Sequence, residues 1–124
     1  MNIPQGLRRW FILHFIVDLI LAIPLFIAPI WFIQLFGFEN ANPVIARLVA
    51  SALFGIGGTS FLIRNATVNT YKTLLTLKII WSTAAIIGSL LAILEGAQAS
   101  TWIIIALFLP FSIVWIYYQS KLSE

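Results

Sequence analysis

The sequence predicts an all-α membrane protein, an up-down bundle of four transmembrane helices with a kinked first helix and a short interfacial helix after it. Of its 124 residues, 61% are hydrophobic and 9% are charged, whereas a soluble domain carries about 25% charged residues. Four apolar stretches are each long enough to cross a hydrocarbon core of about 30 Å. The short segments between them favour antiparallel neighbours. We therefore expect one transmembrane domain over residues 1–124.

The first predicted span covers residues 7–28, and Pro24 in its last turns is expected to kink it. Pro29 suits the first turn of a new helix, so a short interfacial helix is expected over residues 29–36, ended by Gly37.

Arg8 and Arg9, just before the apolar run, resemble the start of an export signal. The apolar core of a signal peptide has about 7–15 residues, and this run is longer and lacks a small-residue cleavage site. An uncleaved first span is therefore expected.

Three further spans follow, each opened or closed by a typical capping residue. Asn42 and Pro43 form a good helix start, Gly96 is a helix terminator, and Ser100 is a candidate N-cap. The predicted spans are residues 43–64, 71–94 and 100–118.

Lysine and arginine are distributed unevenly between the two predicted membrane sides. One predicted side carries a single basic residue, Arg47. The other side carries the remaining six: Arg8, Arg9, Arg64, Lys72, Lys78 and Lys121. Because positive loops stay in the cytoplasm, we expect an integral protein of the inner or plasma membrane with both termini cytoplasmic.

His14 and Asp18 stand one helical turn apart within the first span, with Asp18 near mid-membrane. The apolar residues of the span outweigh the roughly +2.5 to +3.5 kcal/mol for a central carboxylate, which must still face the bundle interior or a wet cavity. Among the candidate partners, Lys78 has the predicted depth in the membrane that best matches that of Asp18. We predict a buried polar cluster of His14, Asp18 and Lys78, and Arg47 stays open as the second choice of partner for Asp18.

A second cluster, Arg47 with Glu95, is predicted at the outer rim. Small residues recur every four positions in the second and third spans, which permits close helix packing or leaves space for a ligand. The residues predicted to line a possible cavity are Trp81, Ser51, Gly55 and Thr59.

Several function classes are disfavoured. The chain has no cysteine, so thiolate chemistry and Cys-based metal sites are excluded. Its single histidine and its few carboxylates form no metal-spaced cluster and no catalytic set. No cofactor, metal or catalytic residue is predicted, and the net charge of +3 is too scattered for a nucleic-acid surface.

The chain resembles the DoxX-like small four-helix membrane proteins of bacteria and archaea. The resemblance is carried by the Arg-Arg-Trp start, the proline near the outer end of the first helix, the segment from Pro29 to Gly37, and then Arg47, Ala50, Gly55 and Gly58. Most members of that group have no assigned function, and some are associated with quinone-linked redox complexes.

These patterns leave three function classes. The first is a small proton-linked transporter or permease-like protein using His14, Asp18 and Lys78. The second is an accessory or assembly subunit of a larger membrane complex, and the third is a quinone- or lipid-binding redox component. The expected partners are the lipid bilayer and either further copies of the chain or another membrane subunit.

Overall fold

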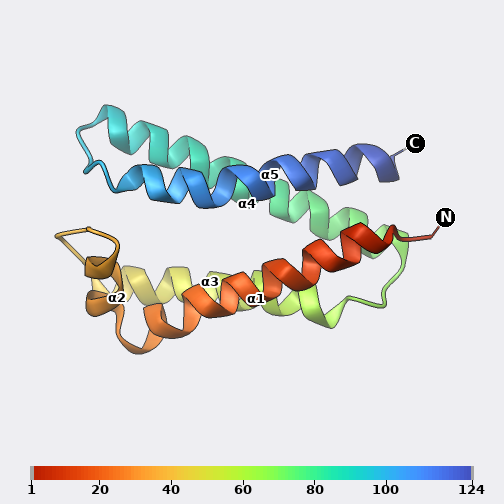
Figure 1. Ribbon diagram of the computed structural model, residues 1–124, viewed down its shortest axis with the longest axis horizontal. Helices are drawn as coiled ribbons and strands as arrows, with labels where there is room; N and C mark the ends of the chain where they lie inside the picture. The colour runs from red at the N-terminus through yellow and green to blue at the C-terminus, as the bar shows by residue number, and fades with distance from the viewer. Residues whose placement is uncertain (1, 124) are drawn as a thin grey trace. The chain divides into compact units, whose positions relative to one another are not determined.

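The computed structural model describes residues 2–123 and contains five helices (Figure 1). Their bounds are α1 (Gln5–Ile27), α2 (Pro29–Leu35), α3 (Pro43–Leu62), α4 (Val68–Leu94) and α5 (Thr101–Leu122). No strand occurs in this described range. The predicted all-α class, with four long helices and a short helix after the first, is confirmed.

Each of the four long helices meets the length and composition of a membrane span. They contain 23, 20, 27 and 22 residues, and at about 1.5 Å per residue each reaches about 30 Å or more. This length matches the hydrocarbon core of a bilayer.

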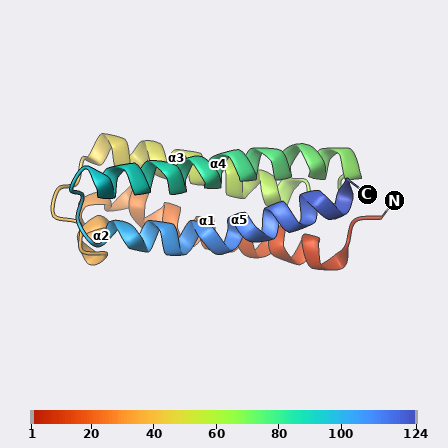
Figure 2. The ribbon, with the colours of Figure 1, turned by 90° about the horizontal axis from the view of Figure 1, so that it is seen from above.

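The chain forms two compact units, residues 1–67 and 68–124. In the first unit α1 packs against α3, and α2 connects their ends. In the second unit α4 packs against α5, and the two helices run side by side in Figure 2.

The break between α1 and α2 follows from local backbone geometry. Pro24 lies inside α1, which continues to Ile27. Ala28 then leaves the helical region with φ −134° and ψ 67°, and Pro29 opens α2 as its first residue. Gly37 closes the short helix with φ 89°, a left-handed conformation that glycine adopts without steric cost.

Three helix ends, at residues 29, 43 and 94, match the expected positions, and the others differ by one to four residues. Asn42 caps α3 as expected, and its Oδ1 accepts hydrogen bonds from the backbone N–H groups of Val44 and Ile45 at 2.9 and 3.3 Å. By contrast, Ser100 makes no side-chain capping bond at the start of α5. That helix extends to Leu122, which is buried, and carries Lys121 in its last turn, where a positive charge favours the helix end.

The buried residues of α1 and α3 recur every three or four positions, so each helix presents one inward stripe. On α1 they are Leu7, Phe11, His14, Asp18, Ala22 and Leu25. On α3 they are Ala46, Ala50, Leu53, Gly57 and Ser60. The α3 stripe consists mainly of small residues, which lets its backbone approach a neighbouring helix closely.

Candidate functional site

An ionisable pair lies inside the first candidate span. His14 Nε2 is 3.3 Å from Asp18 Oδ1, across one helical turn of α1. His14 is 5% exposed and Asp18 is 3% exposed, so both side chains are withdrawn from the molecular surface. Both residues belong to the buried stripe of α1.

A glycine of α3 lies directly against the Asp18 side chain. A Cβ placed on Gly57 would be 2.6 Å from Asp18 Cβ and 2.9 Å from Asp18 Oδ2. Real Cβ atoms essentially never come so close to other atoms, so only glycine fits here while Asp18 holds this position. The carboxylate therefore packs against the main chain of α3.

Sequence reasoning missed Gly57. It belongs to the buried stripe of α3, whereas Gly55, which the four-residue spacing singled out, is exposed. The buried series of α3 becomes visible only in the structure, where Gly57 follows Ala46, Ala50 and Leu53 with alternating spacings of four and three.

Lys78, the third member of the predicted inner cluster, lies in the second unit on α4. It is 1% exposed, and its Nζ is 4.8 Å from the centre of the Trp115 ring on α5. An ammonium group over an indole face is attracted by the quadrupole of the ring, whose faces carry a negative electrostatic potential. Trp115 is itself 1% exposed and stacks on Phe111. The pairing of Lys78 with Asp18 stays a prediction.

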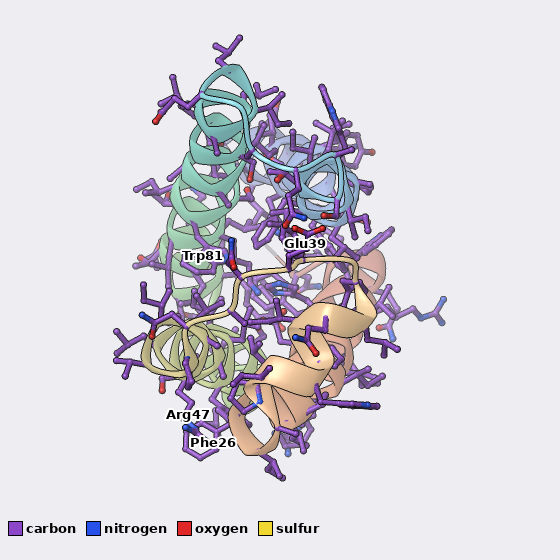
Figure 3. All side chains as sticks on the ribbon, turned by 90° about the vertical axis from the view of Figure 1, so that its left-hand side faces the viewer. Phe26, Glu39, Arg47 and Trp81 are labelled. Carbon is purple, nitrogen blue, oxygen red and sulfur yellow. The ribbon has the colours of Figure 1, made fainter. Side chains whose placement is uncertain are left out.

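Arg47 contacts the end of α1. Its Nε donates a hydrogen bond to the backbone oxygen of Phe26 at 3.0 Å, and Figure 3 shows its side chain reaching this point. Phe26 stands one residue before the last of α1, where carbonyl groups lack an intrahelical partner. Arg47 therefore caps α1 with a positive charge. Glu95 lies in the second unit beyond α4 and is exposed; its pairing with Arg47 stays a prediction.

The small-residue row of α3 faces outward. Ser51 is exposed and Thr59 is partly exposed, and within residues 2–123 no atom lies within 4 Å of a Cβ placed on Gly55. The hydroxyls of Ser51 and Thr59 bond to the carbonyls of Arg47 and Gly55, four residues earlier, at 2.8 and 2.6 Å. Within the first unit the close packing expected at Gly55 is therefore not made, and the cavity predicted at this row stays a prediction.

Trp81, predicted to line a cavity, lies on α4 and packs its ring edge-on against Phe108 of α5, with centroids 5.9 Å apart. Its indole nitrogen is buried and has no hydrogen-bond partner among residues 2–123. A buried indole N–H ordinarily finds an acceptor. That Trp81 lines a cavity stays a prediction.

Within the described residues no group of three or more His, Asp or Glu side chains could hold a metal ion. Four long apolar helices, two of which bury ionisable side chains, define this chain as a small polytopic integral membrane protein. Comparison with known protein families, with curated proteins and with solved structures gives no match.

Proposed function

We propose that the protein is a small proton-linked transporter in which the His14–Asp18 pair binds and releases the proton. The observation that supports this proposal is the burial of both groups, 3.3 Å apart, within an apolar candidate span. Ionisable residues inside spans are costly and commonly belong to proton or solute pathways.

The contact with Gly57 links protonation of the pair to the position of α3. A proton added to Asp18 changes the charge of a side chain that touches the α3 backbone. In a low-dielectric interior such a change alters every nearby electrostatic interaction far more than it would in water. Under this proposal Lys78 supplies a second buried charge on α4, and its pairing with Asp18 stays a prediction.

The test is proton flux into liposomes that contain the purified chain, a trapped pH-sensitive dye and an imposed potassium diffusion potential. We expect wild-type flux above that of protein-free liposomes, and a loss of at least tenfold in Asp18→Asn, which keeps the shape of the side chain but cannot ionise. Glu39→Gln is the matched control, because Glu39 is an exposed carboxylate outside the helices. Circular dichroism and gel filtration verify that each variant folds.

Two results would contradict the transporter proposal: flux in Asp18→Asn equal to that of wild type, or wild-type liposomes no more permeable than empty ones. A folded but inactive Asp18→Asn with an active Glu39→Gln would support it.

A second candidate is an accessory subunit of a larger membrane complex, in keeping with the predicted resemblance to DoxX-like proteins. The outward row on α3 favours it, since an exposed glycine with open space around it suits close approach by a partner helix. Purification in mild detergent would distinguish the two. Under this alternative, Gly55→Leu abolishes the co-purification of another membrane protein or of a second, tagged copy of the chain.

A further inference from the structure

The first turns of α1 border a pocket of about 290 Å³ that the transport proposal does not use. Its lining residues are Gly6, Arg9, Trp10 and Leu13. Arg9 and Trp10 each lie three or four positions from both Gly6 and Leu13, so the four residues share one face of the helix. Gly6 contributes no side chain, and this leaves a hollow beside the helix.

Arg9 supplies an available positive charge to this pocket. Its side chain is exposed, and within residues 2–123 it makes no hydrogen bond, ion pair or ring contact. The neighbouring arginines are occupied. Arg8 Nη1 donates to the backbone oxygen of Arg64 at 3.1 Å, and Arg64 Nη1 donates to that of Phe61 at 2.9 Å.

Within residues 2–67 the carboxylates lie away from this end of the first unit. Residues 1–67 contain two acidic residues, Asp18 and Glu39. Asp18 is buried beside His14. Glu39 follows α2, and this helix lies at the opposite end of the unit from the first turns of α1 (Figure 1). The positive charge of Arg9 is therefore not paired with either carboxylate of its own unit.

The chemistry of the pocket changes along the helix axis in the order found in a phospholipid. Gly6 and Leu13 are about 10 Å apart along the axis, which exceeds the roughly 5–8 Å depth of a headgroup layer. Arg9 thus lies at the level of the phosphate, Trp10 offers an amphipathic ring suited to the interface, and Leu13, 43% exposed, lies against the acyl chains.

We propose that this pocket is a binding site for an anionic phospholipid, with Arg9 holding the phosphate and Leu13 contacting an acyl chain. A guanidinium binds phosphate oxygens through two parallel hydrogen bonds. The site is independent of the His14–Asp18 pair.

The test is titration of the full chain in mild detergent with phosphatidylglycerol or phosphatidylcholine, with bound lipids counted by native mass spectrometry. We expect tighter binding of phosphatidylglycerol. Arg9→Gln should weaken it about fivefold, the effect typical of one basic residue at an anionic membrane surface, while Arg9→Lys keeps most of the affinity. Gly6→Leu fills the hollow without changing the charge and should also weaken binding.

Arg47→Gln is the matched control, because it removes one positive charge from the opposite end of the same unit. Its affinity for phosphatidylglycerol should remain that of wild type. Equal weakening in Arg9→Gln and Arg47→Gln would overturn the proposal in favour of diffuse charge attraction. Equal binding of the two lipids would also overturn it. Displacement of the lipid by millimolar inorganic phosphate would identify a small-anion site and refute the lipid assignment.

Discussion

At the scale of single residues, Asp18 touches the main chain of α3 because residue 57 has no side chain. The contact leaves no room for a methyl group, since a Cβ at that position would lie 2.6 Å from Asp18 Cβ. Gly57 therefore determines both how closely α1 and α3 approach and where the carboxylate lies.

Gly57→Ala should lower the free energy of unfolding by about 1–3 kcal/mol, the usual cost of forcing an extra methyl group into a packed interior. Gly58→Ala is the matched control, because no atom lies within 4 Å of a Cβ placed there. It should be neutral or stabilising by up to about 1 kcal/mol, as alanine favours a helix over glycine. Reversible unfolding in mixed micelles measures both, and equal stabilities would contradict the close contact.

The pair of ionisable residues on α1 could be predicted from sequence, whereas the glycine against it could not. His14 and Asp18 are separated by four positions, which places them on one helix face whatever the packing. The inward side of α3 has no such local signal. Lipid is as apolar as a protein core, so hydrophobicity does not reveal which glycine among Gly55, Gly57 and Gly58 faces the interior.

At the scale of helices, Arg47 joins the first turns of α3 to the end of α1. Its guanidinium donates a hydrogen bond to the carbonyl of Phe26, and its positive charge interacts favourably with the negative end of the α1 dipole. The side chain thereby holds the helix end just before the break at Ala28.

Arg47→Gln should lower the free energy of unfolding by about 1–2 kcal/mol, since it removes a charged hydrogen bond and the favourable charge at the helix end. Arg47→Lys keeps the charge and should lose less. Hydrogen exchange followed by mass spectrometry should show faster exchange around the α1–α2 junction in Arg47→Gln. Unchanged exchange there would show that Arg47 does not hold the helix end.

Hydropathy predicted the number of long helices and their approximate positions, because a span must match the hydrocarbon thickness. It did not predict all of their ends. α4 begins at Val68 and α5 continues to Leu122, beyond the expected residues 71 and 118. These extensions carry polar residues such as Asn69 and Gln119. A helix can continue past the hydrocarbon into the headgroup layer, and there hydropathy does not indicate where it ends.

At the scale of the whole molecule, four spans are expected to place residues 2 and 123 on the same side of the membrane. The distribution of lysine and arginine favours the cytoplasmic side for both. The chain offers a direct test because it contains no cysteine that would react in the background.

Single cysteines at Asn2, Asn65 and Ser123 should resist a membrane-impermeant maleimide added to intact cells, whereas a cysteine at Asn40 should react. All four positions are exposed. Each should react fully once the cells are opened, which controls for local accessibility. Labelling of Ser123→Cys together with protection of Asn40→Cys in intact cells would reverse the predicted orientation.

Each of the two units is built from helices that follow one another along the chain, with α1 against α3 and α4 against α5. Contacts between near neighbours in sequence form quickly, because closing a short loop costs little entropy. The first hairpin can therefore assemble as soon as residue 67 has left the ribosome. The acidic side chain of α1 can then meet its glycine before the second unit has emerged, which would shorten the time that it spends exposed to acyl chains during biogenesis.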